Sequence, residues 1–209
     1  MKVITFSRTF PAHHPRAKQL TFFAEKFWQS MIDNDKTAKA FAPFKAKYRK
    51  EFGFTTDGQG WQEPHIAKHH TIRKGHRWKK GDSFSPRVWG ENINPKSGKS
   101  GPYQSKQITI GPDTEITEVY DFRITKKGEI FLGETEIHLP ELRIIARNDG
   151  FENSDDLEHW FANVKEFDGQ IICWNSKVNY EMPMVKVLGE RTLGYSFQSI
   201  EPIVNLEGN

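Results

Sequence analysis

The sequence predicts an α+β protein whose short strands form a small, partly closed β-barrel with helices packed at its ends. Two observations lead to this prediction. The chain gives, in order, a strand, a helix, many short strand-like runs, a second clear helix and a closing strand. Several of the strand-like runs are separated by turn residues such as Gly128 and Gly133.

The first part of the chain predicts a strand followed by a helix. Residues 2–7, KVITFS, are typical of a short strand, and Pro11 and Pro15 mark the loop that follows. Between residues 18 and 33 the apolar residues recur at helical spacing, so we predict a helix with one broad buried face. The residues of that face are Leu20, Phe23, Ala24, Phe27, Trp28 and Met31.

The middle of the chain changes from helical to strand-like patterns. Residues 37–54 predict a basic helix interrupted at Pro43, and residues 55–60, TTDGQG, predict a loop. A flexible polar loop is expected at residues 92–101, NINPKSGKSG. The predicted strands are residues 69–73, 83–89, 106–110, 115–124, 129–132 and 136–138.

A second clear helix is predicted to begin at Asn153. Asn153 or Ser154 can cap it, and the two aspartates that follow favour the positive end of the helix dipole. Its apolar stripe consists of Leu157, Trp160, Phe161 and Val164. Residues 170–174, QIICW, predict the closing strand, and no internal repeat is present.

Composition excludes several classes of protein. The 209 residues are 36% hydrophobic and 13% aromatic, which is globular composition and not that of a disordered chain. The apolar runs are too short for a membrane-spanning helix, and residues 1–10 lack the apolar core of a secretion signal. The single cysteine, Cys173, cannot form an internal disulfide. We therefore expect a cytoplasmic protein without a membrane partner.

Charge is unevenly distributed along the chain. The net charge is +3, but between Lys45 and Gln107 there are fourteen Lys or Arg residues and five Asp or Glu residues, a local charge of +9. The remainder of the chain therefore carries −6. A basic middle region indicates an anionic partner, and the alternative is that these lysines only solvate exposed loops.

Residues 68–82, KHHTIRKGHRWKKGD, concentrate three histidines and six basic residues. A metal site is one hypothesis, since His65 and His69 are four positions apart. The following residues favour a strand, however, and on a strand that spacing separates side chains by about 13 Å. No acid completes an H-E-x-x-H arrangement, and the neighbouring arginines repel a cation. We expect neither a metal nor a cofactor.

The same segment also fits nucleic-acid binding. Trp78, His70 and Trp89 offer planar surfaces for unpaired bases, although both tryptophans are equally compatible with a core position. Phosphates can be neutralised by the basic residues Lys68, Arg73, Lys74, Arg77, Lys79 and Lys80.

Catalysis is a third hypothesis for this segment. Lys68, Thr71 and Arg73 bring an amine, a hydroxyl and a guanidinium within six residues. On a regular strand Lys68 points away from Thr71, so the two can meet only if the strand begins after Lys68. A desolvated lysine can deprotonate a hydroxyl nucleophile, because its pKa falls readily.

The motif Lys68-x-x-Thr71-Ile72-Arg73, followed by Gly81-Asp82, resembles the ASCH domain, a relative of the PUA domain. Other segments resemble the same family in the same order. They are Thr5-Phe6-Ser7-Arg8, Phe22-Phe23, Ser105-Lys106-Gln107, Asp149-Gly150-Phe151 and Gln170-Ile171-Ile172-Cys173-Trp174. The resemblance extends over about residues 2–176.

This resemblance implies a PUA-like β-barrel at residues 1–180, with an insertion at about 34–64 and a C-terminal extension at 181–209. The family is thought to bind RNA or nucleotides. One branch hydrolyses the acetyl amide of N4-acetylcytidine with a lysine, a threonine and a glutamate, and another has been associated with RNA cleavage. By position, these catalytic residues correspond to Lys68, Thr71 and Asp149, where this chain has the shorter carboxylate.

The resemblance implies a basic cleft beside the first helix that binds RNA or a modified nucleoside. Lys68, Thr71 and Arg73 would form one wall, and Asp149 would form the opposite wall. The alternatives are an amidohydrolase in which Lys68 activates Thr71, a ribonuclease, and an interaction domain that docks an acidic protein. The remaining expected contacts with the ligand are Arg8, Lys74, Arg77, Trp78, Lys79 and Lys106.

Overall fold

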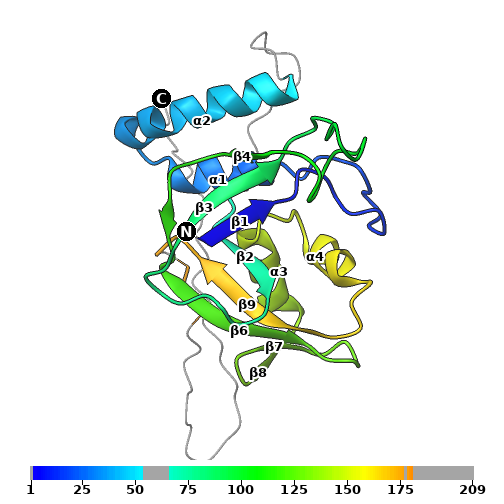
Figure 1. Cartoon of the computed structure of the whole chain (residues 1–209). Coiled ribbons are helices and arrows are strands. Elements are labelled where there is room, and N and C mark those ends of the chain that lie inside the picture. Colours follow the sequence, from blue (N-terminus) through cyan, green and yellow to red (C-terminus); the bar gives the residue numbers. More distant parts are fainter. Residues whose placement is uncertain (1, 54–65, 177, 181–209) are drawn as a thin grey trace, which may run out of the picture.

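The computed structural model describes residues 2–53, 66–176 and 178–180, and these form an α+β structure with four helices and nine strands (Figure 1). The class predicted from the sequence is confirmed. The strands are β1 (Lys2–Phe6), β2 (His70–Lys74), β3 (Ser83–Trp89), β4 (Gln107–Thr109), β5 (Thr114–Glu115), β6 (Glu118–Ile124), β7 (Ile130–Leu132), β8 (Thr135–Ile137) and β9 (Phe167–Cys173). The helices are α1 (Phe23–Met31), α2 (Asp35–Phe52), α3 (Leu139–Asn148) and α4 (Ser154–Phe161).

The strands of the described residues lie in two sheets and do not form a closed barrel, whereas the sequence predicted one partly closed barrel. One sheet has the order β1-β3-β4, with β5 also paired to β3, and β1 runs parallel to β3. The other is antiparallel, in the order β2-β9-β6-β7-β8. Strands β1 and β2 belong to different sheets and are linked by a side chain: Arg73 Nη2 donates to the Thr5 carbonyl at 2.6 Å.

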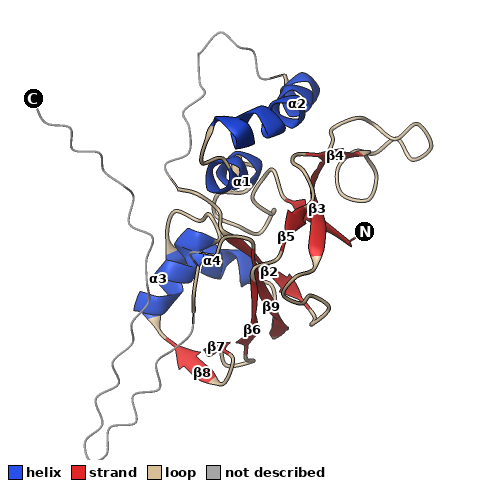
Figure 2. Ribbon diagram, turned by 90° about the vertical axis from the view of Figure 1, so that its left-hand side faces the viewer, coloured by secondary structure: helices blue, strands red, loops and turns tan. Residues whose placement is uncertain are grey.

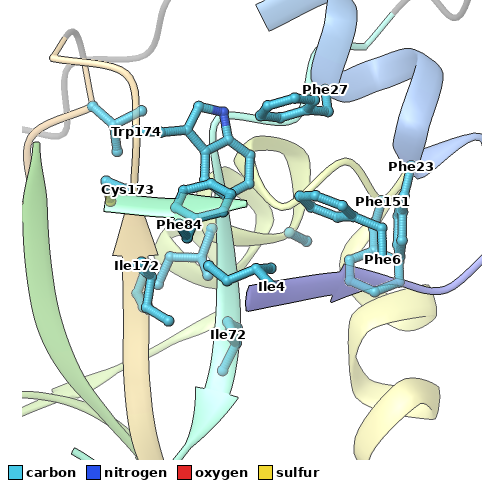
Figure 3. Packing of buried hydrophobic residues seen from close by; sticks show 14 of the residues in the cluster. Ile4, Phe6, Phe23, Phe27, Ile72, Phe84, Phe151, Ile172, Cys173 and Trp174 are labelled. Carbon is cyan, nitrogen blue, oxygen red and sulfur yellow. The ribbon is translucent and has the colours of Figure 1, made fainter. Parts of the chain in front are cut away.

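The core lies between the two sheets and α1 (Figure 3). Trp174, which follows β9, is its centre. Its ring lies 5.8 Å from that of Phe6 on β1, 5.4 Å from Phe27 on α1 and 5.7 Å from Phe84 on β3. Burial of each such side chain contributes about 1.5–3 kcal/mol, so this cluster holds the sheets and α1 together.

Helix α1 begins at Phe23, later than the predicted start at Lys18. Leu20 is not helical, because it forms an isolated bridge to Thr9, and Phe10 N–H donates to the Gln19 carbonyl at 3.0 Å. Backbone pairing in this loop therefore replaces the first predicted helical turn. Phe23 and Phe27 are buried as expected, whereas Met31 is only partly buried.

Helix α2 runs without interruption through Pro43, contrary to the prediction. The proline removes one N–H donor from the helix, but both ends of the helix are capped. The Asn34 side chain accepts from Thr37 N–H at 3.0 Å, and Gly53 ends the helix with a φ of 69°. The helix packs on α1, with Trp28 and Tyr48 in edge contact, while the predicted loop at 55–60 lies outside the described residues.

Helix α3 was not predicted, and its C-cap residue, Asp149, lines the site described below. Its first turn is closed by Glu141, whose carboxylate accepts from His138 N–H at 3.0 Å. Helix α4 begins with the predicted Asn153 cap but ends at Phe161, so Val164 lies beyond it and is exposed. Figure 2 shows α1 and α2 together at one end of the molecule, with α3 and α4 beside each other next to the second sheet.

The other predicted strands are present with small shifts. The predicted run 115–124 is two strands, β5 and β6, and the closing strand β9 begins at Phe167, ahead of the predicted Gln170. The predicted polar loop at 92–101 contains no helix or strand. Residues 54–64 of the expected insertion and the whole expected extension at 181–209 lie outside the described residues.

Candidate active site

A cavity of about 550 Å³ opens between β1, strand β2, the end of β3 with the two residues after it, and the loop residues 100–103. Its volume falls within the range of about 300–1,000 Å³ that is usual for small-molecule sites. Phe6, Phe23 and Phe151 give it an apolar part, and these three side chains lie close together in Figure 3. Its polar and charged lining includes Arg8, Lys68, Thr71, Arg73, Arg77, Glu91 and Asp149.

Lys68 and Asp149 form a buried ion pair in the wall of this cavity. Lys68 Nζ donates to the Asp149 carbonyl at 2.5 Å and also to its carboxylate Oδ1. The two residues are only 1% and 5% exposed. The ammonium also lies 4.2 Å from the centre of the Phe23 ring. The Lys68 cation therefore interacts with both the Asp149 carboxylate and this aromatic ring.

Burial shifts both groups of this pair toward their neutral forms. Desolvation lowers the pKa of Lys68 to about 8, although Asp149 opposes that change. Desolvation also raises the pKa of Asp149, while Lys68 and Arg73 act in the opposite direction. Lys68 is therefore an amine that can give up and accept a proton near neutral pH.

The local backbone explains why Asp149 meets Lys68. Asp149 is the C-cap of α3, and the chain turns at Gly150 with a φ of 83°, in the left-handed region that favours glycine. The Gly150 carbonyl accepts from Lys26 Nζ at 2.7 Å. A Cβ at Gly150 would lie only 3.2 Å from the Cβ of Lys68, so a side chain at this position would also press against Lys68.

Thr71 lines the same cavity as Lys68 and Asp149. It lies on β2 opposite Ile172 and is 4% exposed. Strand β2 begins at His70, so Lys68 precedes the strand and is not bound by its alternation of faces. The structure thus meets the condition under which the amine and the hydroxyl can share a site.

His70 contacts Asp149 but does not line the cavity. Its Nδ1 lies 3.8 Å from Asp149 Oδ1, and neither ring nitrogen makes a hydrogen bond of ordinary geometry. Burial lowers the pKa of His70 well below its usual value, and the positive charge of Lys68 lowers it further. His70 is therefore a neutral ring packed against the ion pair.

Two of the predicted arginines are fixed by bonds to the protein. Arg73 spans the gap between the sheets through its bond to the Thr5 carbonyl. Arg8 pairs with Glu91, and its guanidinium carbon lies 3.4 Å from the centre of the Phe52 ring. The exposed residue Arg77 also lines the cavity, with its guanidinium carbon 5.1 Å from the centre of the Trp78 ring.

The proposed role of Trp78 as an open surface for a base is wrong. The side chain is 2% exposed and packs edge-on against Phe84, with ring centres 6.3 Å apart. It is a core residue whose edge reaches the cavity wall. Trp89 and Tyr103, which also line the cavity, are more exposed: their ring centres are 5.4 Å apart, and Tyr103 is 86% exposed.

Three other predicted ligand contacts do not line the cavity. Lys74, Lys79 and Lys106 are exposed, and none belongs to the cavity wall. Lys74 ends β2, and Lys79 lies in the following turn, where its N–H donates to Asp82 at 2.9 Å. Lys74 and Lys79 lie beyond the buried part of β2, so their charges are on the outer surface.

Two buried charged residues of α1 were not predicted. Glu25 and Lys26 are both nearly inaccessible, and burial raises the pKa of Glu25 and lowers that of Lys26. Their position within the aromatic run FAEKFW was an available indication, because a charge between buried aromatic residues needs a protein partner. Glu91, in contrast, lies in a polar loop that gave no such indication.

Within the residues that the structure describes, no group of three or more His, Cys, Asp or Glu side chains is arranged to hold a metal ion. In the same residues, no helix combines the length and apolar character needed to cross a membrane. Comparisons of the chain with protein-family models, curated proteins and solved structures find no match.

Proposed function

We propose that the chain binds a nucleoside-sized ligand in this cavity and hydrolyses an acyl amide on it, with N4-acetylcytidine as the model substrate. The observation that carries the proposal is the buried pair Lys68–Asp149 in a cavity wall that includes Thr71. A buried ion pair contributes little to stability, since desolvation offsets the attraction. A strongly shifted lysine pKa in a cavity is typical of a site selected for proton transfer.

Membership in the ASCH branch of PUA-like proteins is part of this proposal. The motif K-x-x-T-x-R spans the start of β2, and the Gly81-Asp82 turn precedes β3. The segment Asp149-Gly150-Phe151 follows α3 and returns to the same cavity. These positions agree with the lysine, threonine and acid that the resemblance implies.

The reaction would proceed through an ester of Thr71. Neutral Lys68 accepts the hydroxyl proton, Thr71 Oγ1 forms a bond to the acyl carbon, and the carbon–nitrogen bond breaks. The protonated Lys68 returns the proton to the leaving amine. Water then attacks the ester, Lys68 passes the water proton to Thr71 Oγ1, and the free acid leaves. Asp149 keeps the Lys68 amine oriented throughout.

RNA is the second candidate, as the molecule that carries the reactive base. The observation that favours it is the continuity of the cavity-lining Arg77 with the exposed Lys74 and Lys79 in one short segment. Phosphates outside the cavity can bind these charges while one base enters. The volume of the cavity fits one nucleoside, so binding of a long strand inside it is not proposed.

The test is hydrolysis of N4-acetylcytidine, followed by chromatographic measurement of cytidine. We expect turnover by the wild type and a loss of about 100-fold or more in Lys68→Met, because the general base is removed. Lys127→Met, which removes an exposed lysine of a distant turn, should leave the rate unchanged. Absence of turnover in the folded wild type would contradict the proposed hydrolysis.

A further inference from the structure

The cavity carries more positive charge than its own carboxylates neutralise. Four cationic side chains line it and only two carboxylates do. Glu91 is bound to Arg8, and Asp149 is bound to Lys68. No ion pair among the described residues includes Arg73 or Arg77. Among the described residues, Arg73 and Arg77 therefore line the cavity without a direct ion pair, although the Asp149 carboxylate acts on Arg73 from a greater distance.

Arg73 is held in place with donors to spare. Its Nη2 donates to the Thr5 carbonyl, which anchors one end of the guanidinium. The guanidinium has five N–H donors, and its Nε is buried without a hydrogen-bond partner. Burial lowers the pKa of Arg73, the Asp149 carboxylate opposes that change, and the charge of Arg77 adds to it. Both arginines line the same cavity.

Arg77 is the exposed member of this pair. Its carbonyl accepts from Lys2 Nζ at 2.9 Å, which holds the backbone, while the guanidinium lies near the Trp78 ring. Two guanidinium groups in the wall of one cavity can bind the same anion. Arginine is suited to this role, because its planar set of donors matches the oxygens of a phosphate.

We propose that Arg73 and Arg77 form a phosphate subsite, so that the ligand of this cavity is a nucleotide and not a free nucleoside. The inference rests on the proposed function and specifies its substrate class as an acylated nucleoside monophosphate. The base would lie toward Lys68 and Thr71, and the phosphate toward the two arginines. The apolar part of the cavity, formed by Phe6, Phe23 and Phe151, would contact the base.

The test is a binding measurement that does not depend on hydrolysis. Cytidine and cytidine 5′-monophosphate are titrated into the full chain by calorimetry at low and at raised salt. We expect the monophosphate to bind about tenfold more tightly or better, since bonds between charged groups are the stronger ones. The advantage should shrink as salt rises.

Variants locate the phosphate. Arg77→Gln is the main variant, because its side chain is exposed and its loss should not unfold the chain. It should reduce binding of the monophosphate to the level of cytidine, with cytidine binding unchanged. Arg143→Gln removes the same charge from the exposed side of α3, outside the cavity, and should preserve the difference.

Equal binding of the two ligands by the wild type would overturn the phosphate subsite and leave the proposed hydrolysis standing. A preference that survives Arg77→Gln would also overturn it, as would an equal loss in Arg143→Gln. If neither ligand binds, both this inference and the proposed function fail. A third arm uses the oligonucleotide CpCpC: binding that depends on Arg77 for the oligonucleotide but not for the monophosphate would assign the arginines to RNA and contradict the mononucleotide.

Discussion

Lys68 and Asp149 are 81 positions apart in the sequence, and they form a buried ion pair that joins the approach to β2 to the end of α3. The neighbouring Lys26 of α1 reinforces the same junction through its bond to the Gly150 carbonyl. Three elements thus converge on the cavity wall. The pair is the structural reason why a lysine with a lowered pKa faces the same cavity as Thr71.

The stability of this pair should be strongly non-additive. Lys68→Met leaves the Asp149 carboxylate buried beside a non-polar group, which should lower the free energy of unfolding by about 3–5 kcal/mol. Asp149→Asn should cost less, because the lysine can become neutral. The double variant should be less destabilised than the sum of the two single changes. Urea unfolding measures all four proteins, and an additive result would show that the pair is not coupled.

Gly150 should be needed for space as well as for its backbone angle. Gly150 and Gly128 have φ values of 83° and 85°, but only Gly150 has side-chain atoms of Lys68 within contact of an added Cβ. Gly128→Ala should therefore cost about 1–2 kcal/mol from backbone strain alone. Gly150→Ala should cost at least about 1 kcal/mol more, because it displaces Lys68. Equal losses in thermal or urea unfolding would show that the contact is unimportant.

The elements with strong local patterns were predictable from the sequence. Strand β3 was predicted with its observed bounds, and the Asn153 cap of α4 was identified from the polar residues before an apolar stripe. Helix α3 was missed, because Pro140 and the run of strand-like residues before it concealed a ten-residue helix. The pattern of residues 18–22 was misleading, since pairing between Thr9 and Leu20 overrides helical spacing.

The sequence motifs predicted which residues form the site but not how their side chains are placed. Lys68, Thr71 and Asp149 line one cavity. The burial of Trp78 could not be predicted from its sequence neighbours, because the two residues on each side of it are basic or histidine. Its environment is made by Phe84 and by Gln170, whose side chain accepts from Trp78 N–H at 3.1 Å. Such long-range contacts have no local pattern.

His70 should remain neutral down to acidic pH. Its pKa is lowered in the folded chain, so below about pH 6.5 the unfolded state binds the additional proton. Stability should therefore fall as the pH is lowered through this range, by about 1 kcal/mol per pH unit from this group. His70→Leu should reduce that dependence. The measurement is unfolding at pH 7 and pH 5.5, and an identical pH dependence in the two proteins would contradict the assignment of a neutral, buried ring.

The activity should rise with pH through the titration of Lys68. The neutral amine is the active form, and its pKa is about 8 in the folded chain, so kcat/KM should increase from pH 6.5 and level off above pH 9. Asp149 raises this pKa, so Asp149→Asn should move the midpoint below 8. The pH profile of N4-acetylcytidine hydrolysis measures both. A profile that falls with pH, or a midpoint that does not move, would rule out Lys68 as the base.

The most direct test of the central claim compares Thr71→Ser with Thr71→Val in the hydrolysis of N4-acetylcytidine. Serine keeps the hydroxyl, whereas valine keeps the shape and replaces the hydroxyl with a methyl group. If Thr71 is the nucleophile that Lys68 activates, the serine variant should retain measurable turnover and the valine variant should lose about 100-fold or more in kcat. If folded Thr71→Val hydrolyses N4-acetylcytidine with the kcat of the wild type, Thr71 is not the nucleophile and the account is contradicted.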